Sequence, residues 1–262
     1  MTGIQEAVAA VPHGALIGIG GNINSRRPVA LALELIAQQK RDLTLLGLTA
    51  GLACDLLIGA GCVCRLRSSY TGLEIFGFAP MFRKAVQTGK LAVIEETELT
   101  VAAGLRATLA GLCFLPGRTM HGTDLVSVRE DIKTVVCPYS GEELAALPAI
   151  RPDVALIHAL AVDEQGNAVL GGNLSLDIEL AETSSLTIVS TETVVSHEDC
   201  IRRGVDLIGL SVDKVVHAPK GAWPTSCHPV YPLDGLEIID YLTACEKDGF
   251  EGFLTRLRRA AT

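Results

Sequence analysis

Short apolar runs recur along this chain, and stretches with helical spacing separate several of them. Near-continuous apolar runs that alternate with helices are typical of strands buried on both faces. The pattern therefore predicts an α/β fold, an open, mostly parallel sheet with helices on both faces. The expected strands lie at residues 15–19, 43–48, 134–137, 154–159, 186–190 and 214–217, and the expected helices at 28–39, 78–88 and 100–110.

Three further segments carry local signals. Ser140 precedes residues that predict a short helix at 142–147. The Asp-Glu-Gln-Gly-Asn sequence at 163–167 lies between two apolar runs and predicts a hairpin turn. Residues 237–261 mix charges with Leu, Ile and Phe at helical spacing, which predicts a helix that packs on this chain or on a partner. No repeat or long linker interrupts the sequence, so we expect residues 1–262 to form a single domain.

The composition narrows the class of protein. The chain of 262 residues is 48% hydrophobic but only 4% aromatic, which predicts a large core of Ala, Val, Leu and Ile. Its net charge of -8 at pH 7 arises without an acidic block, and no basic face is visible. Because nucleic-acid binding needs a basic surface, the charge pattern argues against nucleic acid as a partner.

Hydropathy and cysteine content bear on the compartment. The longest apolar region, residues 43–64, is interrupted by Asp55 and by glycines, and the N-terminus lacks the pattern of a signal peptide. We therefore expect no membrane span and a cytoplasmic location. The eight cysteines are then expected to be reduced, and most of them lie in apolar sequence, as small core residues do.

A segment at residues 18–28, which begins with Gly18-Ile19-Gly20-Gly21-Asn22, joins the first expected strand to the first expected helix. Such a turn exposes backbone N–H groups that suit a phosphate, a carboxylate or a developing oxyanion. The alternative is that the glycines serve only a tight turn. The sequence argues against NAD and ATP, because a GxGxxG motif would need glycine at position 23 and no GxxxxGK[ST] motif occurs.

Histidine and cysteine residues offer fewer leads. His121 follows an apolar run and is a candidate general acid or base, with a simple loop hydrogen bond as the alternative. Cys62, Cys64 and the Cys227-His228 pair lack the paired spacing of a zinc site, so we expect no metal. The absence of a GxSxG motif argues against an α/β-hydrolase.

An acidic group, Glu95, Glu96 and Glu98, precedes the expected helix at 100–110. Carboxylates near a helix N-terminus interact favourably with the helix dipole, which is one explanation for them. The other is that one of them enters a cleft and acts as a base or nucleophile. The residues alone leave both explanations open.

A series of segments runs in order over nearly the whole chain and resembles one enzyme family. The segments are Ile19-Gly20-Gly21 with Arg27-Pro28, Leu43-Thr44-Leu45, Ser69-Tyr70-Thr71-Gly72-Leu73-Glu74, Phe114-Leu115-Pro116 with Gly122-Thr123-Asp124, Asp153-Val154-Ala155-Leu156-Ile157-His158 with Asp163 and Gly166-Asn167, and Ala218-Pro219-Lys220-Gly221-Ala222-Trp223-Pro224-Thr225-Ser226-Cys227. Together they resemble the alpha subunit of class I CoA-transferases, especially the glutaconate CoA-transferase type.

The resemblance implies an open, mostly parallel α/β sheet and a working enzyme that pairs this alpha-type chain with a beta subunit. It implies that a catalytic glutamate, supplied by the beta subunit, attacks an acyl-CoA, which gives an anhydride and then a glutamyl-CoA thioester. The CoA thioester is the substrate, and no bound cofactor is implied. The chain's only Glu-x-Gly sequence, Glu164-Gln165-Gly166, lies in the expected hairpin turn, and we do not assign it as the nucleophile.

The same resemblance suggests which residues this chain contributes. The amides of Gly20, Gly21 and Asn22 are expected to hold the acyl oxygen. Arg26 or Arg27, close by in the sequence, is expected to bind an acyl carboxylate.

Glu98 is the candidate catalytic residue. Counting back from Gly122-Thr123, it falls where the related succinyl-CoA:3-ketoacid transferases carry an oxyanion-side glutamine, but a carboxylate donates a hydrogen bond only when protonated. The chain also resembles the alpha-type subunit of a steroid-ring-opening CoA hydrolase, in which a glutamate near this place is implicated in chemistry. We predict the alpha subunit of a heteromeric CoA-transferase. One alternative is a hydrolase that opens a ring-derived β-diketone acyl-CoA with Glu98 as base, and another is a non-catalytic ligand-binding relative.

Overall fold

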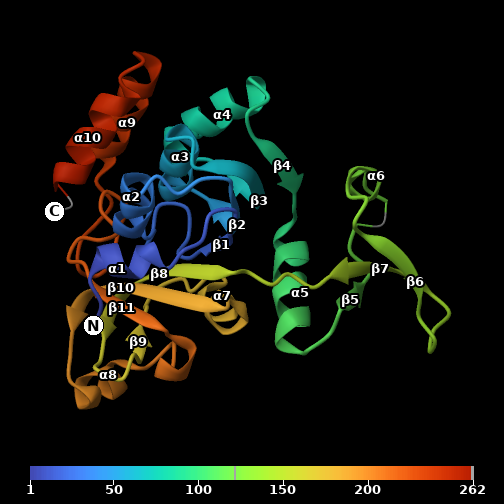
Figure 1. Ribbon diagram of the computed structural model, residues 1–262. Helices are drawn as coiled ribbons and strands as arrows, with labels where there is room; N and C mark the ends of the chain where they lie inside the picture. Colours follow the sequence, from blue (N-terminus) through green and yellow to red (C-terminus); the bar gives the residue numbers. More distant parts are fainter. Residues whose placement is uncertain (121, 261–262) are drawn as a thin grey trace.

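The computed structural model describes residues 1–120 and 122–260, in which the chain forms a large sheet and a small one (Figure 1). The large sheet has eight strands, with the order β11-β10-β8-β1-β2-β3-β4 and with β9 paired to β8. Neighbours along this order are parallel, and only β9 runs antiparallel to its partner among the described strands of this sheet. The strands are β1 (Leu16–Ile19), β2 (Leu43–Ala50), β3 (Val63–Thr71), β4 (Ala92–Glu95), β8 (Val154–Val162), β9 (Ala168–Val169), β10 (Leu186–Val194) and β11 (Lys214–His217).

Helices cover both faces of the large sheet, as the alternating pattern predicts (Figure 1). Helices α1, α2, α3, α9 and α10 contribute to the apolar core on one face, and α5 and α7 contribute to the core on the other. The helices are α1 (Ile4–Ala9), α2 (Val29–Ala37), α3 (Leu52–Gly59), α4 (Pro80–Gln87), α5 (Glu98–Leu109), α6 (Leu125–Val128), α7 (Asp177–Thr183), α8 (His197–Arg203), α9 (Gly235–Glu246) and α10 (Phe250–Ala260).

Strand β8 shows why the apolar runs are nearly continuous. Leu156 packs into the core on the side of α2 and α3, whereas Ala155 and Ile157 pack into the core on the side of α5 and α7. Successive side chains of a strand point to opposite faces, so a strand covered on both faces needs apolar residues at every position. The open, mostly parallel sheet with helices on both faces is therefore confirmed.

The small sheet departs from the sequence prediction. Strands β5 (Phe114–Gly117), β7 (Glu143–Pro148) and β6 (Lys133–Val136) pair antiparallel and project from the large sheet beyond α5 (Figure 1). The short helix expected at 142–147 is wrong, because β7 occupies this segment. Ala145 and Leu147 on β7 pack against α5, so cross-strand pairing and burial override the local preference for a helix.

Two other local predictions are confirmed. Residues 163–167 form the turn of the β8–β9 hairpin, where the N–H of Asp163 donates to the carbonyl of Asn167. Residues 237–260 are helical as expected, although residues 247–249 divide them into two helices, α9 and α10. Both helices pack on this chain, through Ile238, Tyr241 and other apolar side chains. None of the described helices has both the length and the apolar character needed to cross a membrane.

Candidate active site at the carboxyl edge of the sheet

The loops that follow β1, β2, β3 and β4 all leave the same edge of the large sheet. Parallel strands end at one edge, and ligands of open α/β sheets bind there. Gly20, Gly21 and Asn22 follow β1 directly, and Glu98 opens α5 just after β4. Because β2 and β3 lie between β1 and β4, about 14 Å of sheet separates these two groups along the edge.

The glycines after β1 are required by a close approach of the chain. Gly21 has a positive φ of 74°, and a Cβ there would lie 2.5 Å from the carbonyl oxygens of Ser25 and Arg26. A Cβ at Gly20 would lie 2.7 Å from a carboxylate oxygen of Asp177. The loop therefore folds tightly over itself and over a buried acid, which only glycine allows at these two positions.

The backbone N–H groups of this loop already have acceptors within the protein. Gly20 donates to the carbonyl of Leu156 at 2.8 Å, and Asn22 donates to the carbonyl of Ser25 at 2.9 Å. Gly21 donates to Asp177 Oδ1 at 2.7 Å. The three amides that the sequence suggested for an acyl oxygen are therefore engaged in this structure. The residue that the sequence analysis missed is Asp177, which is 156 residues away in the chain.

Arg27 is fully buried beneath the glycine loop. Its Nε donates to the carbonyl of Ile23, and its Nη1 donates to the carbonyls of Ile19 and Gly20. Its Nη2 donates to the carbonyl and to the hydroxyl of Thr49, so all five N–H donors are used by protein acceptors. Burial lowers the pKa of Arg27 from its usual value.

Arg26 is also buried, but it has a carboxylate partner. Its Nη1 lies 2.8 Å from Asp177 Oδ2, and its Nη2 donates to the carbonyl of Asn173 at 2.5 Å. Burial raises the pKa of Asp177, and the Arg26 guanidinium opposes that rise. In this structure neither Arg26 nor Arg27 presents its guanidinium to solvent, and both brace the loop that leads from β1 to α2.

Two glutamates at the β4–α5 junction lie in different surroundings. Glu96 is buried and accepts hydrogen bonds from Arg67 at 2.6 Å, from Arg129 at 2.6 Å and from the hydroxyl of Thr100. Glu98, the first residue of α5, is exposed and has no hydrogen-bond or ion-pair partner in the described part of the chain. The acidic group therefore supplies one buried anchor and one accessible carboxylate.

A buried polar network lies beyond the end of β1, between β8 and β10. His158 Nε2 lies 2.7 Å from Glu192 Oε1, and its Nδ1 lies 2.8 Å from the Ser190 hydroxyl. The Tyr231 hydroxyl donates to Glu192, and so does the N–H of Lys220. Burial lowers the pKa of His158. The network pins the loop after β11 to the sheet, and it joins residues too far apart in sequence to form a motif.

His158, Glu192 and Cys227 lie close enough to be tested as metal ligands, with donor atoms within 4.8 Å of one another. Both ring nitrogens of His158 and both oxygens of Glu192 are already hydrogen-bonded. Burial raises the pKa of the Cys227 thiol to about 12, so the thiolate that a metal needs is disfavoured. The chemistry of this group fits a closed hydrogen-bond network better than a metal site.

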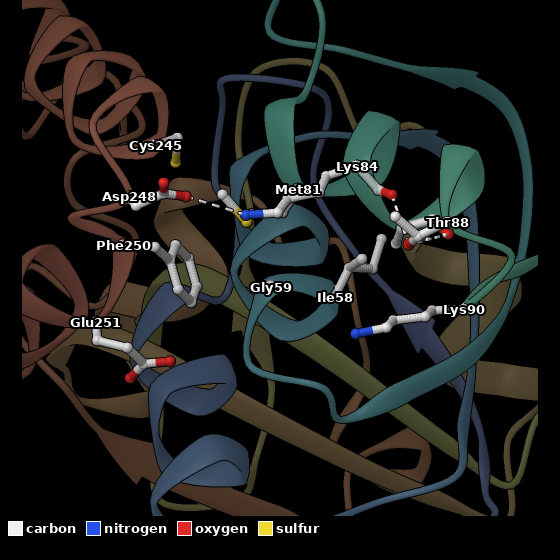
Figure 2. A pocket seen from close by; sticks show the side chains of 11 residues that line it. Ile58, Gly59, Met81, Lys84, Thr88, Lys90, Cys245, Asp248, Phe250 and Glu251 are labelled. Atoms are coloured by element: carbon white, nitrogen blue, oxygen red, sulfur yellow. Dashed lines mark hydrogen bonds and ion pairs between the residues drawn. The ribbon is translucent and has the colours of Figure 1, made fainter.

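Two candidate features remain. His121, the candidate acid or base, lies outside the described residues. A cavity of about 300 Å³ is formed between the ends of α3 and α4 and the α9–α10 pair, and its lining includes Ile58, Lys84 and Phe250 (Figure 2). None of the residues that the sequence suggested for the site lines this cavity.

The sequence of this chain is similar to those of several known proteins. Residues 1–218 match the family model described as Coenzyme A transferase. One subunit of the 3-oxoadipate CoA-transferase of Pseudomonas knackmussii is 37% identical over 79% of this chain and 74% of its own length. One subunit of the glutaconate CoA-transferase of Acidaminococcus fermentans is 33% identical over 95% of this chain and 85% of its own length. The cholesterol ring-cleaving hydrolase IpdA subunit of Rhodococcus jostii is 34% identical over 88% of this chain and 82% of its own length.

Solved structures agree over almost the full length. A variant of the decarboxylase AibA/AibB superposes with a TM-score of 0.92 at 36% identity, over 98% of this chain and 97% of that one. The glutaconate CoA-transferase of Acidaminococcus fermentans superposes with a TM-score of 0.89 at 32% identity, over 97% and 87%. The fold, including the projecting small sheet, is therefore shared with proteins whose names describe different reactions.

Proposed function

The chain belongs to the coenzyme A transferase family, and from that premise we propose that it is the alpha-type subunit of a heteromeric enzyme that moves CoA between carboxylic acids. The transferase relatives are named as single subunits of their enzymes, which implies a partner for this chain as well. The substrates are then an acyl-CoA thioester and an acceptor carboxylate.

The observation that carries this proposal is the state of the buried carboxylates at the carboxyl edge. Glu96, Asp177 and Glu192 each accept hydrogen bonds from two or more protein donors. A carboxylate nucleophile must reach the substrate carbonyl with a free oxygen, so these three are poorly suited to the task. Glu164, in the only Glu-x-Gly sequence, lies in the β8–β9 turn. The engagement of these carboxylates supports a catalytic glutamate on the partner subunit, and exposed Glu98 is considered separately below.

The proposed reaction conserves atoms and charge without a cofactor. The partner's glutamate carboxylate attacks the thioester carbonyl, the C–S bond breaks, and CoA leaves as a thiolate with a mixed anhydride formed. The thiolate then attacks the glutamyl carbonyl, which releases the first acid as a carboxylate and leaves a glutamyl-CoA thioester. The acceptor carboxylate attacks that thioester, and the same steps in reverse give the new acyl-CoA and free glutamate.

This chain would supply the wall of the acyl site. In the proposal, Gly20, Gly21 and Asn22 line the pocket beside the reacting carbonyl. Arg26 and Arg27 lie behind that loop, hold its shape through their hydrogen bonds and add positive potential. Fixed positive charge in a buried position stabilises the negative charge that develops on an acyl oxygen during attack.

A second candidate is a ring-opening acyl-CoA hydrolase, which the exposed and unpaired state of Glu98 in the described structure favours. There Glu98 would take a proton from water, whose oxygen attacks one carbonyl of a ring-derived β-diketone. The bond between that carbonyl carbon and the carbon shared by the two carbonyls then breaks. Glu98 returns its proton to that shared carbon, so water is consumed and the ring opens to an acid.

The test is turnover by the assembled enzyme. The chain is co-expressed with a beta-type chain from the neighbouring gene and incubated with a panel of acyl-CoA thioesters and acetate, and mass spectrometry follows products and protein adducts. Acetyl-CoA, with CoA trapped on a partner glutamate, supports the transferase. An acyl-CoA product with a cleaved ring, formed without need of acetate, supports the hydrolase, and no turnover at all favours a ligand-binding role.

A further inference from the structure

Within the described chain, Asn22 has a free hydrogen-bond donor in its side chain, next to the engaged backbone amides of Gly20, Gly21 and Asn22 itself. The backbone N–H groups of Gly20, Gly21 and Asn22 are all engaged, as described above. The Asn22 side chain is half-buried, and its Oδ1 accepts from the Thr49 hydroxyl at 3.0 Å. Its Nδ2 has no acceptor within residues 1–120 and 122–260. The carboxamide N–H₂ is therefore a donor that remains free beside the three engaged amides.

The orientation of this carboxamide follows from the chemistry of Thr49. A hydroxyl has two acceptor positions and one hydrogen to donate. The Thr49 oxygen accepts from Arg27 Nη2 at 2.9 Å and from the N–H of Ile23 at 3.3 Å, which fills both acceptor positions. Its hydrogen must then go to an acceptor, and Oδ1 of Asn22 is the atom in reach. Thr49 therefore selects the rotation of the amide that turns Nδ2 away from it.

Arg27 restricts the direction in which the Thr49 hydroxyl can donate its hydrogen bond. Its Nη2 cannot accept a hydrogen bond, so the Thr49 hydroxyl has no means of donating in that direction. The same nitrogen also donates to the Thr49 carbonyl, which ties the guanidinium to the end of β2. Arg27 is fully buried and Thr49 nearly so, and a hydrogen-bonded chain in such surroundings is held rigidly.

We propose that Asn22 Nδ2 donates to the acyl oxygen of the CoA thioester and of the derived anhydride, and that Thr49 is the positioning residue for it. The inference rests on the proposed CoA-transfer function. In this proposal the loop has a different role from the one that the sequence suggested, because the donor is a side chain and not the glycine backbone. Thr49 orients that side chain, and Arg27 fixes Thr49. An amide N–H that is already in position before the reaction can stabilise the negative charge that develops on the acyl oxygen during attack.

The first test compares Asn22→Asp with the wild-type complex. The substitution keeps the size of the side chain but replaces the N–H₂ donor with an acceptor, so kcat for CoA transfer should fall about 10²- to 10³-fold. KM should change far less, because the lost bond strengthens in the transition state. Co-purification with the partner and an unchanged circular dichroism spectrum establish that the variant folds. A kcat within about threefold of wild type overturns the proposal.

The second test separates positioning from packing at Thr49. Thr49→Ser keeps the hydroxyl and should retain kcat within about threefold, whereas Thr49→Val keeps the shape, loses the hydroxyl and should lose about 10- to 100-fold in kcat. Thr44→Val, on the same strand and outside this chain of hydrogen bonds, is the matched control and should stay at the wild-type rate.

The outcomes distinguish the inference from the function beneath it. Equal losses in Thr49→Ser and Thr49→Val overturn the positioning role, because shape and not the hydroxyl would then matter. If Thr49→Val fails to assemble, Thr49→Ser and Asn22→Asp decide the question. A wild-type complex that transfers CoA, together with unaffected variants, rejects only this inference. A wild-type complex without any CoA turnover rejects the proposed function and the inference with it.

Discussion

Two regions at the carboxyl edge bury arginine side chains, but in only one of them does each of these arginines pair with a carboxylate of the described chain. In the glycine loop, residues 20–27, Arg26 forms an ion pair with Asp177. Arg27 makes no ion pair in the described chain and is held by carbonyls and a hydroxyl. The loop therefore buries one guanidinium, that of Arg27, that has no carboxylate paired with it in the described chain.

The β4–α5 junction, residues 96–98, is balanced. Glu96 accepts from both Arg67 and Arg129, and Arg129 also forms two hydrogen bonds with Asp131. Arg129 holds the pKa of Asp131 below its usual range. Two guanidiniums thus meet two carboxylates, and the cluster joins β3 and α5 to the segment before β6.

The difference shows how the same side chain serves two purposes. Buried arginines that are paired with carboxylates produce little electrostatic potential outside the cluster. At the junction, this paired cluster fixes the start of α5. A buried guanidinium without a paired carboxylate adds positive potential at the loop, where the proposed acyl oxygen becomes negative. The following substitutions break or sharpen this comparison.

Asp177→Asn should have the largest effect. The change keeps an oxygen for the N–H of Gly21 but removes the only carboxylate bound to buried Arg26 in the described chain, and breaking such a pair costs about 3–5 kcal/mol of unfolding free energy. Urea unfolding measures it. Glu179→Gln, on the same helix, removes the partner of exposed Arg106 and should cost less than about 1 kcal/mol. Equal costs for the two variants would contradict the role given to Asp177.

Glu96→Gln should have the next largest effect. It removes the charge that holds Arg67 and Arg129 together, at a cost of about 2–3 kcal/mol of unfolding free energy. The cost is smaller than at Asp177 because Arg67 reaches solvent. Differential scanning calorimetry tests it, with Glu95→Gln as the exposed neighbouring control. A stability equal to that of the control would show that the junction does not depend on this anchor.

Asp55 shows what a buried carboxyl does without an arginine. It accepts from the N–H groups of Met81 and Phe82 and from the Tyr241 hydroxyl, and burial raises its pKa to about 6 from 3.8. A raised pKa means that ionisation is costly in the folded state. This contribution to stability is therefore complete below pH 3.8 and is lost as pH rises through 6.

The expected size of this pH effect follows from the shift. Between about pH 5 and pH 7.5 the stability of the wild type should fall by about 1.4 kcal/mol relative to Asp55→Asn, which cannot ionise. Urea unfolding of both proteins at the two pH values gives the difference. A pH-independent gap between them would mean that the carboxyl at this position titrates normally in the folded protein.

Glu98→Gln should have the smallest effect. An exposed side chain without a partner in the described chain contributes within about 0.5 kcal/mol to stability, and CoA transfer should stay within about twofold of wild type. Acyl-CoA turnover by the assembled enzyme measures it. A loss of a hundredfold or more in CoA transfer, with stability unchanged, would show that Glu98 takes part in the chemistry of the transferase.

Local pattern was sufficient wherever one segment contains its own signal. The apolar runs at 15–19 and 154–159 predicted strands of the parallel sheet, and the turn at 163–167 closes the β8–β9 hairpin as expected. Pattern failed at 142–147, since β7 is stabilised by pairing with strands on both sides and by burial against α5. Pairing partners far away in the chain leave no mark in the periodicity of the segment itself.

The sequence by itself determined the family, the alternation of strands and helices, and the need for glycine after β1. Only the tertiary structure decided what that glycine loop can do. Asp177, 156 residues away, accepts a hydrogen bond from the N–H of Gly21. Thr49, 27 residues away, donates its hydroxyl hydrogen to Oδ1 of Asn22. A buried donor must find an acceptor somewhere, and which acceptor it finds depends on the packing of distant segments and not on its neighbours in the chain.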